Sequence, residues 1–235
     1  MIKRLKDKLA SIIEEEEQKI ILMDASGGSR EPDLRVVGLF SEIVDEKIAE
    51  IIHAMLFMNE MNKAEEDEKK RKDIEFYLST YGGSADDMFA LYDMMKIIEN
   101  DTDISVIGMG KVMSAGVLIL AGGTKGKRKI GRNCRVMLHS VIAGNQGPLH
   151  NLINEMEAIQ DLQEMYIERL VEETKMTKKQ LKKLLEQKVN IYLSAEQAVE
   201  YGIADEIIWG NQMSDLNKIL KEEYDKKNST VTTQS

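Results

Sequence analysis

Strand-like runs that are each followed by a short turn and a helical pattern are the feature that most constrains the fold of this chain. Residues 74–78 are rich in β-branched and aromatic side chains, and a glycine pair separates them from a helical pattern over residues 85–99. The same order recurs as a strand pattern over residues 104–109 and a short apolar helix over residues 114–120. A further strand pattern ends at His139. Successive units of this kind predict a parallel sheet layered with helices, which is an α/β fold.

The periodic segments outside these units extend the same plan. A strand pattern over residues 35–40 precedes a helical pattern over residues 45–61, for which Asp45 is the expected N-cap. After His139, one long helical pattern covers residues 149–174, an element nearly 40 Å long at about 1.5 Å per residue. Its apolar stripe is wide for a surface helix, so we expect it to contact another subunit.

The length of 235 residues fits one main domain with a substantial core. We expect that domain to cover residues 35–210, with residues 1–34 as an N-terminal appendage and residues 211–235 as a C-terminal helix and frayed tail. Residues 63–72 are nearly all charged, which favours a solvated loop or a helix extension over a binding role.

Charge and composition exclude several classes of partner. A net charge of −9 argues against nucleic acid, whose binding depends on basic side chains that neutralise phosphates. No run approaches the ~18 apolar residues of a membrane span, and the single cysteine, Cys134, allows no intrachain disulfide. Together these features favour a cytoplasmic protein.

The sequence predicts neither a metal nor a cofactor. No cluster of His, Cys, Asp and Glu has the spacing of metal ligands. Residues 122–127 contain glycines and lysines, but their spacing fails the phosphate-loop pattern and they follow a helix instead of opening one.

Ser114 and His139 are candidates for a nucleophile and its base. Ser114 opens the short apolar helix, and His139 ends a strand pattern 25 residues later. A serine hydroxyl needs a base to take its proton, and histidine performs that role near neutral pH. Either residue alone would usually be structural, as a helix cap or a core histidine. A glycine turn at residues 81–84 and the N–H group of Ala115 offer bare backbone donors for an oxyanion, so the set indicates acyl transfer.

Several motifs in a fixed order carry a family resemblance over residues 35–208. They are 56–57 (Leu-Phe), 82–84 (Gly-Gly-Ser), 113–116 (Met-Ser-Ala-Gly), 125–128 (Lys-Gly-Lys-Arg), 135–139 (Arg-Val-Met-Leu-His) and 193–203 (Leu-Ser-Ala-Glu-Gln-Ala-Val-Glu-Tyr-Gly-Ile). In this order and spacing, the chain resembles the Clp protease proteolytic subunit family, the ClpP serine peptidases.

The resemblance implies a ClpP/crotonase-like fold of stacked strand-turn-helix units with a projecting handle helix after Gly147. It also implies a serine endopeptidase of an ATP-dependent Clp-type protease, which cleaves unfolded polypeptides inside an oligomeric chamber. The implied partners are further copies of the chain in stacked heptameric rings and a hexameric AAA+ unfoldase ATPase. The oxyanion donors would be the N–H groups of Gly83 and Ala115. Extended substrate would bind, by strand addition, at Gly82, Ile142, Ala143 and Gly144.

The chain departs from the family pattern at the third member of the triad. Where the family has an aspartate, this chain has Asn190, whose carbonyl can orient an imidazole but adds no negative charge. Asn190 therefore either orients His139 in a slow peptidase, or a carboxylate such as Glu186 replaces it, or the chain is a structural or regulatory ring subunit with little activity. A crotonase-type acyl-CoA enzyme is a further alternative, and it would not need the serine and histidine pair. Residues 1–34 and 63–72 do not match the family well.

Overall fold

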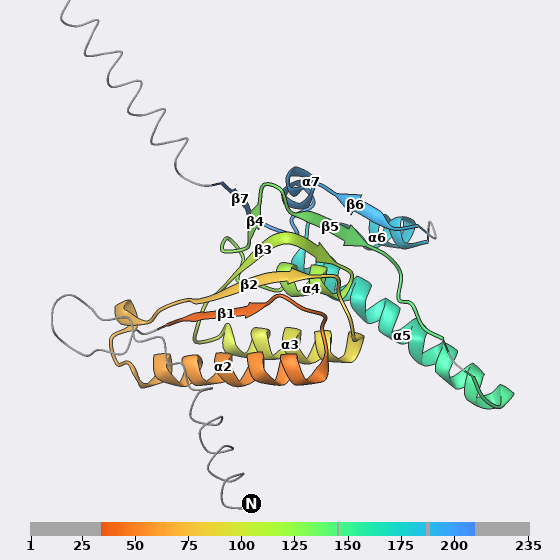
Figure 1. Ribbon diagram of the computed structural model, residues 1–235, viewed down its shortest axis with the longest axis horizontal. Helices are drawn as coiled ribbons and strands as arrows, with labels where there is room; N and C mark the ends of the chain where they lie inside the picture. The colour runs from red at the N-terminus through yellow and green to blue at the C-terminus, as the bar shows by residue number, and fades with distance from the viewer. Residues whose placement is uncertain (1–33, 145, 187–188, 210–235) are drawn as a thin grey trace, which may run out of the picture. The chain divides into compact units, whose positions relative to one another are not determined.

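The computed structural model describes residues 34–144, 146–186 and 189–209 (Figure 1). The predicted appendage, apart from residue 34, and the predicted C-terminal helix and tail lie outside them. The two domain boundaries therefore stay predictions.

A seven-stranded sheet forms the centre of the described chain. Five strands follow the order β1 (Val36–Leu39), β2 (Ile74–Thr80), β3 (Ile104–Met113), β4 (Lys129–Gly131) and β7 (Glu206–Ile208), with every neighbouring pair parallel. The end of β3 pairs instead with β5 (Arg135–Leu138) in parallel, and β5 pairs with β6 (Ile191–Leu193) antiparallel. The predicted parallel α/β fold is confirmed.

Six α-helices pack around this sheet in the described residues. They are α2 (Asp45–Ala64), α3 (Ala85–Ile98), α4 (Ala115–Ala121), α5 (Leu149–Glu173), α6 (Lys178–Leu185) and α7 (Ala195–Glu200). In Figure 1, α2 and α3 lie side by side along one face of the sheet, and α5 projects away from it. The projecting helix of 25 residues corresponds to the predicted handle.

The core is aliphatic and methionine-rich, and α4 lies within it. All seven residues of α4 are buried, which explains its uninterrupted apolar sequence. Around it pack fully buried side chains from the strands and from α3, among them Phe76, Leu78, Met88 and Leu91. Because α4 is buried by the surrounding elements, the position of its N-cap residue, Ser114, is fixed.

A buried ion pair ties the end of this core to β7. Arg128, which is 5% exposed, donates through Nε and Nη2 to the two carboxylate oxygens of Asp205, at 2.8 and 2.5 Å. Its remaining nitrogen donates to the backbone oxygens of Ala121 and Glu173, at the last residues of α4 and α5. The buried guanidinium of Arg128 thus has both an opposite charge and hydrogen-bond acceptors, as a buried charge requires.

The predicted N-cap of α2 is wrong. Val44 is the N-cap residue and provides no side-chain capping bond, while Asp45 is the first residue inside the helix. At that position its carboxylate lies beside the positive end of the helix dipole, so an acidic residue is still favourable there.

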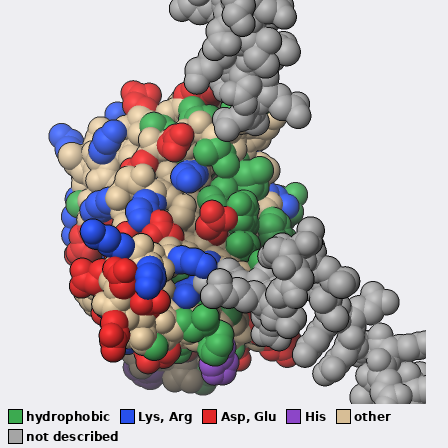
Figure 2. All heavy atoms as spheres, turned by 90° about the vertical axis from the view of Figure 1, so that its left-hand side faces the viewer, with side chains coloured by type: hydrophobic (Ala, Val, Ile, Leu, Met, Phe, Trp, Pro, Cys, Tyr) green, Lys and Arg blue, Asp and Glu red, His purple; other side chains and the backbone are tan. Residues whose placement is uncertain are grey.

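The charged segment over residues 63–72 forms the end of α2 and a short 3-10 helix, η1 (Glu68–Lys70). Its side chains pair locally, as Lys63 does with Glu60 and Lys70 with Asp67. Figure 2 views this end of the protein and shows basic and acidic side chains intermingled. These exposed ion pairs between basic and acidic side chains agree with the expected solvated segment, and the segment forms no patch of a single charge.

Candidate active site

Ser114 occupies a strained turn between β3 and α4. Its φ of 55° is the one positive value of a non-glycine residue in the described chain, and its ψ is −125°. The Ser114 N–H donates to the Met137 carbonyl at 2.8 Å, while the Ser114 carbonyl accepts from the Val117 N–H at 3.0 Å and the Tyr166 hydroxyl at 3.1 Å. Such strain persists only where the surroundings fix the backbone, and it exposes a nucleophile at a strand-to-helix turn.

The Ser114 side chain does not cap α4, although Ser114 is the N-cap residue. This removes the ordinary structural reason for a serine at a helix start. The hydroxyl is instead part of the wall of a pocket of about 340 Å³.

The glycine turn after β2 approaches Ser114 too closely for any other residue. A Cβ on Gly82 would lie 2.6 Å from the Ser114 Cβ, and one on Gly83 would lie 2.2 Å from the Ile43 carbonyl oxygen. Both glycines also have positive φ, +106° and +154°. The turn is fixed because the Ile43 N–H donates to the Gly82 carbonyl and the Ser84 N–H donates to the Ile43 carbonyl.

Two backbone N–H groups beside Ser114 have no acceptor among the described residues. Ala115 is the first residue of α4, so its N–H has no partner within the helix. The Gly83 N–H is left unpaired because the bridge to Ile43 uses the groups on either side of it. Gly83 and Ala115 line the same pocket as Ser114. Unpaired N–H groups in one pocket are the kind of donor that stabilises an oxyanion.

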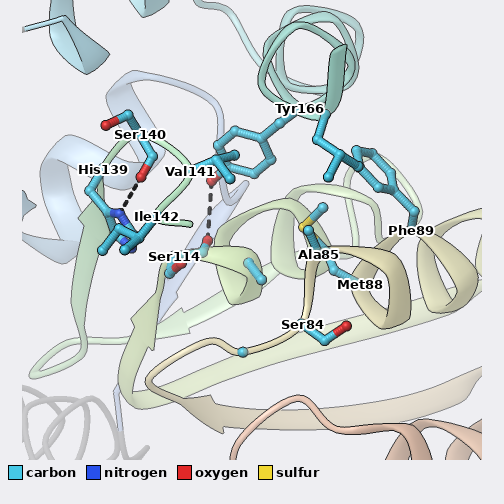
Figure 3. Close-up of a pocket in the computed structure, with 13 residues that line it drawn as sticks. Ser84, Ala85, Met88, Phe89, Ser114, His139, Ser140, Val141, Ile142 and Tyr166 are labelled. Carbon is cyan, nitrogen blue, oxygen red and sulfur yellow. Dashed lines mark hydrogen bonds between the residues drawn. The ribbon is translucent and has the colours of Figure 1, made fainter. Parts of the chain in front are cut away.

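His139 follows β5 and lines the same pocket (Figure 3). Its Nδ1 lies 2.5 Å from the backbone oxygen of Ser140. A carbonyl can only accept, so this contact assigns the proton to Nδ1 and leaves the lone pair on Nε2. That tautomer is the one a general base needs. No hydrogen bond joins the side chains of His139 and Ser114 in the described structure, and such bonds often tighten only when substrate binds.

The other wall of the pocket is mainly apolar. Met88 and Phe89 of α3 and Leu162 and Tyr166 of α5 complete it, as Figure 3 shows for the labelled residues. A cavity of this size and lining accepts an apolar side chain next to the reactive group. Burial raises the pKa of Tyr166 far above its ordinary value, so its hydroxyl stays a neutral donor to the Ser114 carbonyl.

Only part of the predicted substrate segment lines this pocket. Ile142 lines the pocket and is 81% exposed, whereas Gly82, Ala143 and Gly144 are not among its lining residues. Residues 141–144 have no regular secondary structure. Their role in strand addition stays a prediction.

Comparison with known proteins gives the family. The sequence model described as Clp protease matches residues 29–211. The chain belongs to the Clp protease family. The ATP-dependent Clp protease proteolytic subunit of Mesostigma viride is 30% identical over 185 residues, which cover 78% of this chain and 76% of that protein. The family assignment predicted from the motifs is therefore confirmed.

The residue that departs from the family pattern, Asn190, lies one step beyond a strand pair. The antiparallel ladder ends with Leu138 opposite Ile191, so one more step would place His139 opposite Asn190. Asn190 is exposed, and no hydrogen bond joins it to His139 in the described structure. Backbone register thus brings Asn190 near His139, but the contact to Nδ1 comes from the Ser140 carbonyl.

The alternative carboxylate, Glu186, belongs to the wall of a different cavity. It is exposed at the end of α6 and lines a second cavity, of about 520 Å³, together with Ser140 and Val141. Within the described residues it makes no hydrogen bond to His139. The Glu186 alternative thus stays a prediction.

Sequence reasoning missed the groups that hold the two candidate catalytic residues. One is the Ser140 carbonyl, which contacts His139 and, as a backbone group, has no sequence signature. The other is the Tyr166 hydroxyl, which donates to Ser114 and was missed because Tyr166 fits the apolar stripe of α5. The described residues hold no group of three or more His, Cys, Asp or Glu side chains placed to bind a metal ion. None of their helices is both long and apolar enough to cross a membrane.

Proposed function

We propose that this member of the Clp protease family is a serine endopeptidase with Ser114 as nucleophile and His139 as general base. The observation that carries the proposal is the strained Ser114 in a pocket that also contains His139 and two unpaired backbone N–H groups. A serine that merely capped a helix would need neither the strain nor the donors.

The chemistry follows from this arrangement. The Ser114 Oγ attacks the carbonyl carbon of the scissile peptide bond while the His139 Nε2 takes its proton. The negative charge moves to the carbonyl oxygen, which accepts from the N–H groups of Gly83 and Ala115. Protonated His139 then gives its proton to the leaving amine, and the acyl-enzyme is hydrolysed by water through the same base.

The proposed substrates are unfolded polypeptides in extended form. Residues 142–144 offer backbone groups outside any sheet, which supports binding by strand addition next to the pocket. Gly82 lies directly beside Ser114, where a Cβ would occupy space next to the reactive hydroxyl. We assign substrate binding to Gly82, Ile142, Ala143 and Gly144 on this basis.

We further propose that the chain acts as an oligomer, in stacked heptameric rings served by a hexameric AAA+ ATPase in the cytoplasm. The N-terminal half of α5 supports the oligomer, because Leu149, Ile153 and Met156 are all exposed there. An exposed apolar stripe on a projecting helix is typical of a surface that another subunit covers. The relative named ATP-dependent Clp protease proteolytic subunit supports the ATPase partner.

Cleavage of casein and of a short fluorogenic peptide tests the enzyme proposal. We expect the wild type to cleave and the Ser114→Ala and His139→Gln variants to lose that activity. Ser41→Ala is the matched control, because Ser41 is an exposed serine outside the pocket. Activity that survives in Ser114→Ala would come from a contaminant or another site and would contradict the assignment.

A second candidate function is that of a ring subunit with little activity of its own. Asn190 favours it, because an amide cannot stabilise the imidazolium that forms during the reaction. An inactive wild type together with an active Asn190→Asp variant would establish this second function. The crotonase-type alternative gains no support from the site, since it would not need His139 beside Ser114.

A further inference from the structure

We propose that Gln163 of α5 is a positioning residue that fixes the peptide group between Ser140 and Val141, so that the Ser140 carbonyl orients His139. This inference rests on the proposed peptidase function. It assigns to a backbone carbonyl the orienting role that a triad carboxylate has in other serine peptidases.

Two hydrogen bonds at opposite ends of one peptide group carry the inference. The Val141 N–H donates to the Gln163 Oε1 at 2.7 Å, and the Ser140 carbonyl lies 2.5 Å from the His139 Nδ1. Because a peptide group is planar, holding its N–H in place also fixes the direction of its carbonyl. The side chain of Gln163 therefore acts on the His139 ring through one rigid unit.

The peptide group needs such a support because β5 no longer holds it. Strand β5 ends at Leu138, and residues 139–144 have no regular secondary structure. Ile142, two residues beyond Ser140, is 81% exposed. The bond from Val141 to Gln163 ties this segment to a packed helix.

The Gln163 side chain leaves its amide nitrogen unsatisfied when its oxygen accepts from Val141. Its Nε2 is buried and has no hydrogen-bond partner in the described structure, which is unfavourable for a buried donor. The Oε1 must face Val141, because the Val141 N–H can only donate. Only the acceptor half of the amide is thus used, and that half is what the proposal requires.

The same turn of α5 also holds the nucleophile. Tyr166, three residues after Gln163, donates to the carbonyl oxygen of Ser114 at 3.1 Å. Residues three apart lie on one face of a helix, so one turn of α5 fixes the backbone on both sides of the proposed active site. Figure 3 shows the two contacts, from Tyr166 to Ser114 and from Ser140 to His139, in the same pocket.

The Ser140 carbonyl replaces only part of what a carboxylate does. It accepts from Nδ1–H, so it selects the tautomer whose Nε2 can take a proton. The carbonyl carries no full negative charge, so it stabilises the imidazolium less than a carboxylate would. We therefore expect the rate of the chemical step to depend on Gln163, while substrate affinity depends on it much less.

Three substitutions on α5 test this dependence in the full-length protein. Gln163→Met keeps the size of the side chain but removes its oxygen acceptor, whereas Gln163→Glu keeps an acceptor oxygen. Gln160→Met is the matched control, because Gln160 lies on the same helix and is exposed. We expect Gln163→Met to lower kcat on a fluorogenic peptide by about 10- to 100-fold with KM within about threefold, since a misplacement near 1 Å has this effect. Gln163→Glu should recover most of kcat, and Gln160→Met should match the wild type.

The ¹⁵N NMR spectrum of histidine-labelled protein gives a measurement that does not depend on activity. The chain has three histidines, so the signal of His139 is assigned by its loss in His139→Gln. We expect the Nδ1-protonated form in the wild type and in Gln163→Glu, and a shift toward the Nε2-protonated form in Gln163→Met.

Each outcome distinguishes this proposal from the proposed function. A wild type with His139 protonated on Nε2 would overturn the positioning role without any variant. Unchanged kcat and tautomer in a folded Gln163→Met would overturn it as well, while the peptidase function stood. A wild type that cleaves nothing would overturn the peptidase function, and the tautomers in wild type and Gln163→Met would still decide whether Gln163 positions His139.

Discussion

A methyl group added at Gly83 should disable the proposed oxyanion site with little change elsewhere. The new Cβ would lie 2.2 Å from the Ile43 carbonyl oxygen, about 1 Å closer than the ~3.3 Å at which carbon and oxygen normally meet. The Gly83 backbone must therefore move by roughly 1 Å, which takes its N–H outside the narrow range of a useful donor. Loss of one such donor costs about 10²–10³ in kcat, or roughly 2.7–4 kcal/mol, and a 1 Å misplacement about 10².

Steady-state cleavage of a fluorogenic peptide measures this effect. We expect kcat of Gly83→Ala to fall by about 10²–10³ while KM changes much less, because the donor acts on the transition state. Gly126→Ala is the matched control, since Gly126 also has positive φ, +87°, but a Cβ there meets nothing within 4 Å. It reports the effect of backbone strain alone. A folded Gly83→Ala protein with kcat within about threefold of wild type would refute the oxyanion role of Gly83.

Three further predictions concern groups that support the site and the core. Tyr166→Phe removes the hydroxyl donor to the Ser114 carbonyl, so urea unfolding should show a loss of about 1 kcal/mol and kcat should fall severalfold; unchanged values would contradict this support. Burial alone would raise the pKa of Asp205, but its hydrogen bonds with Arg128 outweigh burial and hold that pKa below its usual value. The stabilisation by Asp205 is therefore present above its unfolded-state pKa of about 3.9 and is lost as the pH falls through its lower folded-state pKa. Asp205→Asn should therefore lower the urea midpoint at pH 7, and the difference in midpoint between wild type and variant should shrink below about pH 4. A difference that persists at low pH would contradict this account of Asp205. Burial also raises the pKa of the Cys134 thiol to about 11, so iodoacetamide at pH 8 should alkylate it only after denaturation, and rapid alkylation of the native protein would be inconsistent with that burial.

Sequence reasoning reached the α/β fold because each unit has a strong local signal. The period-2 and period-3.6 patterns of β2 (Ile74–Thr80) and α3 (Ala85–Ile98) follow directly from which faces are buried. The extension of β3 to Met113 was missed, because its last residues pair with β5 and that partner lies far along the chain. The wrong N-cap at Asp45 reflects the same limit, since a cap depends on backbone angles that composition does not report.

The residues of the candidate site could be predicted from the sequence, but the groups that hold Ser114 and His139 in place could not. Ser114, His139, Gly83 and Ala115 were named from motifs, and the structure places all four around one pocket. Three features of the site have no sequence signature: the φ of 55° at Ser114, the Nδ1 contact to the Ser140 carbonyl, and the hydrogen bond from the Val141 N–H to the Gln163 Oε1. Each depends on how distant segments pack against one another. The family resemblance therefore offered only side chains, Asn190 or a carboxylate such as Glu186, as partners of His139 and did not indicate a backbone carbonyl.

Covalent labelling with a fluorophosphonate probe tests the central claim, that Ser114 is an activated nucleophile, most directly. The reagent reacts only with a serine whose proton a neighbouring base removes. We predict one adduct per chain on the wild type, located on Ser114 by mass spectrometry of its peptides and absent from Ser114→Ala and His139→Gln. An unlabelled wild type, or an adduct on another serine, would contradict the claim.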